Sequence, residues 1–227
     1  MALAGGILAL DRMTVRVMLS SPLVAAPLVS ALLGMPLLGL LTGILFQLLW
    51  IRETESTAKW APDAGFAALV ASAITASLIG PLSTGERLMT LWPYGIAFGI
   101  ILSPLAGSSR WFVANWLSQR LSDFDAAVTR ADVPAIRRLI SFAASVHFLT
   151  GALLAGISYF MGYTGWALFK WIWFEADPIL LTIVPLIAGL AIASVARLFL
   201  HRDTVLAFVL GAIGFTVLEL IRRSSVL

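Results

Sequence analysis

Long hydrophobic runs separated by short polar segments occupy most of the chain. Two of these runs lie within Met18–Asp63, where Gly34-Met35-Pro36 separates them and the polar segment 52–63 follows. Each run is marginal for crossing a hydrocarbon core about 30 Å thick, which takes about 20 helical residues. Proline and glycine interrupt both runs, and in a membrane such broken helices often border a transport site near the middle of the bilayer. We therefore expect the candidate site in this stretch.

The rest of the chain predicts further helices, so the expected fold is an all-α polytopic membrane protein. It would have two Pro/Gly-broken membrane-inserted hairpins followed by about five transmembrane or interfacial helices. The later helical segments are 64–79, 90–105, 109–128, one from about Asp132, 139–161, 163–174, 178–200 and 204–221. Segment 64–79 is rich in alanine and serine, which predicts a tightly packed rather than a lipid-facing helix. We expect Pro93 and Pro104 to interrupt segment 90–105. We divide this single membrane domain into three parts: 1–107 with the site, a basic amphipathic connection 108–138, and the C-terminal helices 139–227.

The first ten residues are apolar but too short to span a bilayer unaided. Two arrangements stay open for them: pairing with residues 18–30 as an inserted hairpin, or the remnant of a longer first helix. Asp11 and Arg12 follow directly, so a cleaved signal peptide is not expected. Asp11 belongs either to an ordinary interfacial turn or to the site, because charges inside membranes are rare and often functional.

Composition agrees with a membrane location. Hydrophobic residues make up 60% of the chain and charged residues 12%, with a mean hydropathy of +0.97. Soluble domains carry about 25% charged residues. The net charge of +3 reflects loop topology rather than nucleic-acid binding in so apolar a chain, and the absence of cysteine excludes disulfides and thiolate metal sites.

Polar residues next to the broken helices are the first binding candidates. Gly39, Gly43 and Gln47 share one helix face, with the two glycines at the spacing that lets helix backbones approach closely. The Gln47 amide can bond either a sugar hydroxyl or a neighbouring helix, and both readings stay open. Asp63 lies directly before an apolar run, which predicts a helix N-cap there whatever else the residue does.

Two features of the later chain have both a structural and a functional interpretation. Segment 108–138 carries five arginines and three aspartates, so the positive-inside rule places it in the cytoplasm. It is either a solvated extension of membrane helices or a docking surface for a soluble partner or anionic lipid. His147 is the one ionisable residue of the apolar run 139–161, which makes it an accessory site candidate.

Motifs for self-contained catalysis are missing from the sequence. It contains no Walker A or Rossmann glycine pattern, no G-x-S-x-G elbow, and no clustered metal-ligating residues. Paired carboxylates within apolar runs are also missing, since only Glu219 lies inside one. We therefore expect a carrier or assembly subunit without cofactor or metal, rather than an enzyme.

A set of short motifs in constant order resembles a known family. They are Leu10-Asp11-Arg12, Ser20-Ser21-Pro22-Leu23-Val24, Gly34, the Gly39/Gly43 pair, Gln47-Leu48-Leu49-Trp50 and Ala61-Pro62-Asp63. Over about residues 5–76 the chain resembles the membrane subunit IIC of the mannose/fructose/sorbose family of the bacterial phosphoenolpyruvate-dependent sugar phosphotransferase system.

The resemblance implies a sugar permease subunit, multi-pass in the bacterial inner membrane and oligomeric there. Its partners would be the membrane subunit IID and the soluble phosphoryl carriers IIB and IIA, with a hexose-like sugar as substrate. The sugar-facing candidates are then Gln47, Glu55, Pro62 and Asp63, with Asp11 and His147 as accessory candidates.

The chain also departs from the family pattern. Relatives usually carry P-x-G-A before Pro-Asp, where this chain has Glu53–Lys59, and Ser21 stands where many relatives have Arg. These departures favour the alternative of a non-transporting or regulatory membrane homologue, whereas the retained Gln47 and Pro62-Asp63 favour the permease.

Overall fold

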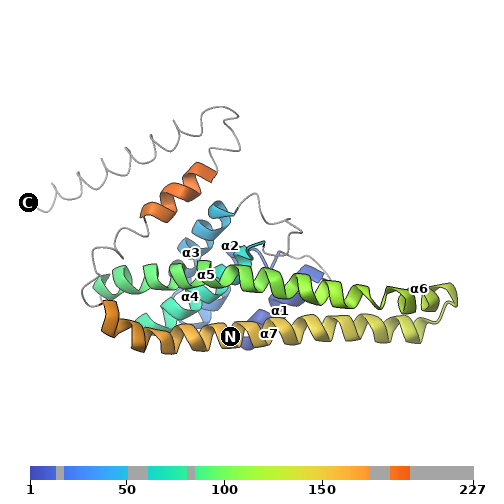
Figure 1. Cartoon of the computed structure of the whole chain (residues 1–227). Helices are drawn as coiled ribbons and strands as arrows, with labels where there is room; N and C mark the ends of the chain where they lie inside the picture. The colour runs from blue at the N-terminus through green and yellow to red at the C-terminus, as the bar shows by residue number, and fades with distance from the viewer. Residues whose placement is uncertain (14–17, 51–60, 81–84, 174–184, 195–227) are drawn as a thin grey trace, which may run out of the picture.

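Every element of the computed structural model is a helix within the residues that it describes: 1–13, 18–50, 61–80, 85–173 and 185–194. This confirms the predicted all-α class (Figure 1). The helices are α1 (Ala2–Met13), α2 (Pro22–Leu32), α3 (Pro36–Leu49), α4 (Ala64–Ile79), α5 (Gly85–Ser118), α6 (Leu121–Thr129), α7 (Val133–Trp173) and a further short helix, Pro185–Ser194.

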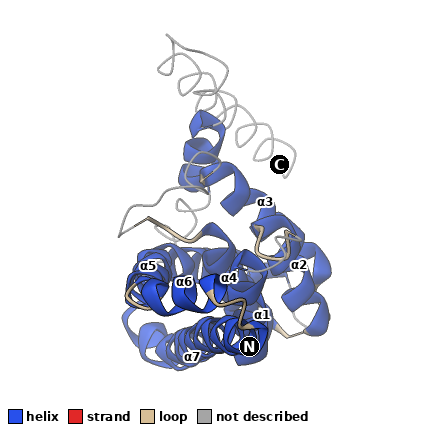
Figure 2. Ribbon diagram, turned by 90° about the vertical axis from the view of Figure 1, so that its right-hand side faces the viewer, coloured by secondary structure: helices blue, strands red, loops and turns tan. Residues whose placement is uncertain are grey.

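Helix α4 is the centre of the molecule. Every residue from Ala64 to Ala76 is buried, and α1, α2, α3, α5 and α7 all pack against it (Figure 2). Its sequence is rich in alanine and serine, whose small side chains let neighbouring backbones come close. The prediction of a tightly packed rather than lipid-facing helix at 64–79 is confirmed, with the same bounds.

The broken stretch at 18–50 forms a hairpin of α2 and α3. Gly34 adopts a positive φ of 80° in the turn between them, a conformation that glycine reaches without strain. A Cβ atom at Gly39 would collide with the Ala26 carbonyl and the Ser30 hydroxyl of α2. The predicted close approach at the glycine pair therefore occurs, and its partner is the preceding helix.

The N-terminal helix does not complete a hairpin with α2. It packs along α7 instead, and the two backbones come together at Gly5 and Gly151. Of the two arrangements left open for the first ten residues, pairing with 18–30 is therefore not the one adopted.

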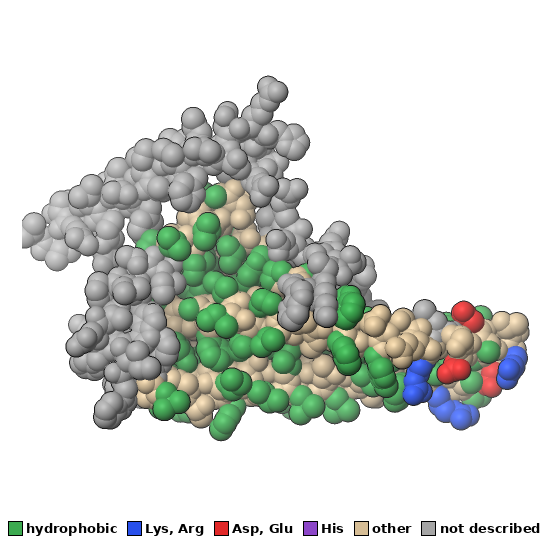
Figure 3. All heavy atoms as spheres, in the orientation of Figure 1, with side chains coloured by type: hydrophobic (Ala, Val, Ile, Leu, Met, Phe, Trp, Pro, Cys, Tyr) green, Lys and Arg blue, Asp and Glu red, His purple; other side chains and the backbone are tan. Residues whose placement is uncertain are grey.

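Two long antiparallel helices, α5 and α7, run the length of the molecule and extend beyond the other helices, with α6 between their far ends (Figure 1). At 1.5 Å per residue, their 34 and 41 residues give lengths of about 50 and 60 Å, well beyond a hydrocarbon core of about 30 Å. Segments Leu91–Ser118 and Val133–Leu168 are apolar and long enough to span a bilayer. The charged side chains gather at the projecting end, and apolar ones cover the body (Figure 3).

The two long helices have fewer breaks than the sequence predicts. We predicted interruptions at Pro93 and Pro104, a separate helix at 109–128 and another at 163–174. Instead α5 runs unbroken to Ser118, the break falls at 119–120, and α7 runs unbroken to Trp173. Proline 104 cannot donate to the Ile100 carbonyl, but the Ser103 hydroxyl donates to it at 2.8 Å, which satisfies that acceptor within the helix.

The last two predicted spans, 178–200 and 204–221, lie mostly outside the described residues. The helix Pro185–Ser194 falls within the first of them.

Candidate functional site

A small, partly open cavity of about 60 Å³ lies where α1, α4, α5 and α7 meet. Most of its lining is apolar, from residues such as Leu8, Phe66 and Leu154. The charged and ionisable side chains in the lining are Asp63, Arg110 and His147, which come from three different elements. A small apolar pocket with a few converging polar groups is the usual form of a ligand site.

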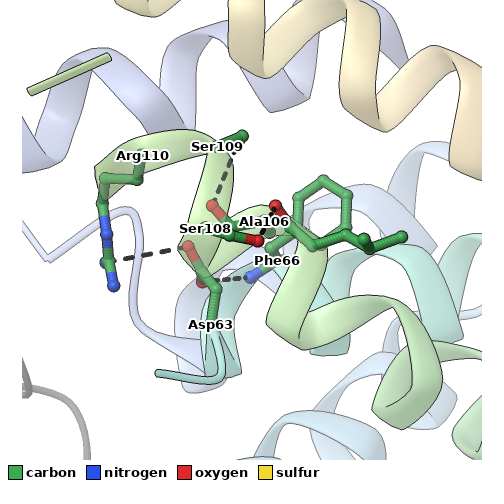
Figure 4. A network of polar contacts seen from close by, with 7 residues as sticks. Asp63, Phe66, Ala106, Ser108, Ser109 and Arg110 are labelled. Atoms are coloured by element: carbon green, nitrogen blue, oxygen red, sulfur yellow. Dashed lines mark hydrogen bonds and ion pairs between the residues drawn. The ribbon is translucent and has the colours of Figure 1, made fainter. Parts of the chain in front are cut away.

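Asp63 is fixed at the start of α4 by three interactions, and Figure 4 shows those with Phe66 and Arg110. Its carboxylate accepts from the Phe66 backbone N–H at 2.9 Å, which confirms the predicted N-cap. Its own backbone N–H donates to the Ser103 carbonyl of α5 at 3.2 Å. The Arg110 guanidinium lies 3.8 Å from the other carboxylate oxygen. The buried charge is thus stabilised by the helix N-terminus and by a cation.

The approach of Pro62-Asp63 to α5 depends on one glycine. The extended segment before α4 crosses α5 at Gly107, where a Cβ atom would collide with the Ala61 carbonyl oxygen. The hydroxyls of Ser108 and Ser109 turn back to carbonyls of their own helix, at 2.6 and 2.9 Å. At the crossing, α5 therefore carries only small side chains, and their hydroxyls are already hydrogen-bonded within the helix. Arg110 follows directly and lines the cavity.

His147 reaches the cavity from α7. The residue is buried, and its Nε2 atom has no hydrogen-bond partner among the described residues. An unpaired buried polar atom costs free energy unless water or a ligand pairs with it. A cavity of about 60 Å³ has room for roughly two water molecules at about 30 Å³ each. The Nε2 atom is therefore a buried polar atom of a cavity-lining residue, and the described residues supply no partner for it.

Gln47 lies elsewhere, near the end of α3, and is not among the described residues that line the cavity. Its Oε1 atom is also buried without a hydrogen-bond partner in the described part of the chain. A helix-to-helix bond through this oxygen is therefore not seen among the described residues. Glu55 lies outside the described residues.

Asp11 has a clear structural task. The residue is buried at the end of α1, and its carboxylate accepts from the Ser20 backbone N–H at 2.8 Å. It thereby connects the end of α1 to the turn before α2. It is not one of the described residues that line the cavity.

Comparison with known families decides the identity of the chain. Residues 1–222 match the family described as the sorbose-specific IIC component of the phosphotransferase system. The chain belongs to this family. The resemblance drawn from the N-terminal motifs is thus confirmed and extends over nearly the whole chain. Neither the curated proteins nor the solved structures contain a match.

As a IIC component, the protein is a membrane-embedded part of a sugar phosphotransferase system and works with the other components of that system. Among its predicted site residues, the structure brings Asp63 and His147 to one cavity and leaves Gln47 and Asp11 off its lining. The sequence analysis did not identify Arg110 as a site residue. It assigned Arg110 to the basic stretch 108–138, and the partner of Arg110, Asp63, lies 47 positions earlier in the chain. No local pattern relates the two residues.

Proposed function

We propose that this IIC component is a sugar permease subunit that translocates a hexose-like sugar across the bacterial inner membrane as a multi-pass protein. In this proposal it acts with the membrane subunit IID, while the soluble carriers IIA and IIB phosphorylate the sugar. The family match over residues 1–222 carries the proposal.

The cavity at the start of α4 supports a sugar-binding role for Asp63 and His147. A carboxylate, a guanidinium and an imidazole nitrogen offer both acceptors and donors, which is what sugar hydroxyls require. A volume of about 60 Å³ holds one hydroxyl-bearing group rather than a whole hexose. We therefore infer that sugar entry widens the cavity by moving α1 and α7 relative to α4 and α5. Gln47, whose side-chain oxygen has no partner among the described residues, would contact another part of the sugar.

Binding of labelled hexoses and amino sugars to the chain purified with its IID partner tests the proposal. We expect saturable binding that weakens about tenfold or more in Asp63→Asn, since a hydrogen bond to a charged group contributes about 1.5–3 kcal/mol. Gln47→Ala should weaken it about two- to tenfold, since a neutral hydrogen bond contributes about 0.5–1.5 kcal/mol. Asp132→Asn and Gln119→Ala are matched controls. Asp132 caps α7 at an exposed position by accepting from the Ala135 N–H at 3.0 Å, and Gln119 is exposed beyond α5.

The outcomes separate the proposals. Unchanged binding in Asp63→Asn and Gln47→Ala would contradict the site. A stable complex that binds no sugar would contradict the permease and favour the regulatory homologue, for which the altered segment Glu53–Lys59 and Ser21 are the motivating departures.

A further inference from the structure

A second hollow lies on the outside of the α5–α7 pair. It is an open groove of about 490 Å³ lined by Phe112, Val113 and Trp116 of α5 and by Val146 and Thr150 of α7, with two serines at one end. Phe112 is 65% exposed and Trp116 37% exposed, so the aromatic side chains border the groove without closing it. The volume is in the range of small-molecule sites, about 300–1,000 Å³.

One end of the groove carries an arginine held against aromatic rings. The Trp116 and Phe142 ring centroids lie 5.9 Å apart across the two helices. The Arg120 guanidinium carbon lies 5.5 Å from the first ring and 5.2 Å from the second, within the range of a cation–π contact. Arg120 is exposed and forms no ion pair with a described carboxylate. The two rings therefore hold the guanidinium in place, and its N–H donors can bind an anion.

Arg120 lies at the end of the apolar part of the helix pair, where a membrane surface is expected. The apolar segment of α5 ends at Ser118, two residues before Arg120, and the groove extends from Trp116 back along the apolar side. Arg138 lies one turn before Phe142 on α7 and adds positive charge at the same level. The carboxylates of the projecting end, on Asp123, Asp125 and Asp132, follow further along the chain, in α6 and at the start of α7.

We propose that the groove binds an acyl chain of an anionic phospholipid, and that Arg120 pairs with the lipid phosphate. A guanidinium binds phosphate oxygens in bidentate fashion, and the basic end of the hairpin faces the cytoplasmic leaflet, which contains anionic lipids. The lipid would wedge between α5 and α7 next to Ser109, Val113 and Thr150, which also line the cavity with Asp63 and His147. It would therefore occupy the outer wall of the candidate sugar site.

Native mass spectrometry of the full chain with its IID partner tests this lipid site. Phosphatidylglycerol and phosphatidylcholine are added at equal concentration, and we expect preferential retention of phosphatidylglycerol. Arg120→Gln should lower that retention about fivefold or more. Arg130→Gln, which removes the same charge from an exposed position after α6, should leave it nearly unchanged.

A second variant keeps the proposal testable if Arg120→Gln affects folding. Val146→Phe fills the groove without removing charge, and it should also reduce retention of the lipid. Equal retention of the two lipids, equal losses in Arg120→Gln and Arg130→Gln, or no retention in the complex would each overturn the proposal. The last result would mean that the partner subunit, rather than a lipid, covers the groove.

Discussion

Asp63 combines a structural and a chemical task in one side chain. As the N-cap of α4, it starts the most buried helix of the molecule, and as the partner of Arg110 it places a charge at the cavity. Asparagine retains the cap but loses the charge, whereas alanine loses both. The two substitutions therefore separate the two tasks.

Loss of the Asp63 cap should lower stability. We expect Asp63→Ala to reduce the free energy of unfolding by about 1 kcal/mol, with Asp63→Asn within about 0.5 kcal/mol of the wild type. Arg110 is one-third exposed at the side chain, so water screens the charge that remains in Asp63→Asn. Thermal unfolding in detergent measures both variants. Equal destabilisation by the two substitutions would contradict the capping role.

His147 should matter for binding and little for stability. Its Nε2 atom is buried without a partner among the described residues, so His147→Leu removes an unsatisfied polar atom and should leave the melting temperature nearly unchanged or raised. Sugar binding should weaken in the same variant. Ser145→Leu, at an exposed position of the same helix, serves as a control for added apolar surface. A large loss of stability with normal binding would show that His147 is a packing residue.

At the scale of elements, the long helices continue through positions where the sequence predicts breaks. Proline 104 predicts a break, yet the Ser103 hydroxyl satisfies the carbonyl that the proline leaves free. Tyr94 adds a link between the long helices by donating to the Gly162 carbonyl of α7 at 2.7 Å. Neither interaction can be read from hydrophobic periodicity, which treats each segment alone.

The crossing of the 61–63 segment over α5 should be sensitive to a single methyl group. We expect Gly107→Ala to lower the free energy of unfolding by about 1–3 kcal/mol, because the new methyl collides with the Ala61 backbone. The collision also displaces Asp63, so sugar binding should fall as well.

Gly156→Ala is the matched control for this substitution. Its Cβ would lie 3.6 Å from Ala2, an ordinary contact, and alanine favours a helix by up to about 1 kcal/mol over glycine. Thermal unfolding and sugar binding of the two variants, measured side by side, check the prediction. An unchanged Gly107→Ala variant would contradict the close crossing.

At the scale of the whole molecule, the described residues on the face that Figure 3 draws form an apolar body and a charged projecting end. Large exposed apolar side chains on α7 include Leu149, Leu153, Ile157 and Phe160. Soluble monomers rarely expose so large an apolar surface, whereas a bilayer covers it. The charged end carries the α6 residues and lies beyond the apolar segments.

Single cysteines test this placement cleanly, because the chain contains no cysteine. Thr129→Cys and Leu153→Cys are both at exposed positions of the structure, so only the membrane distinguishes them. A membrane-impermeant maleimide should label Thr129→Cys in inside-out vesicles and not in intact cells, if the basic end faces the cytoplasm as the positive-inside rule predicts. Leu153→Cys should stay unlabelled in both. Labelling of both cysteines at equal rates would contradict the bilayer placement.

The sequence by itself determined the all-helical class, the N-cap at Asp63 and the close approach at Gly39. These features follow from composition, from cap chemistry and from residue spacing, all of which are local. The order of motifs also identified the family, now matched over residues 1–222.

Only the tertiary structure decided which segments share a site. Asp63, Arg110 and His147 come from three elements, and their meeting depends on α1 and α7 packing against α4 and α5. The same holds for the groove at Arg120, which needs residues from both long helices. The physical reason is that the packing of apolar helices depends on small residues and on the complementary shapes of the helix surfaces. A linear pattern of hydrophobic positions does not specify either.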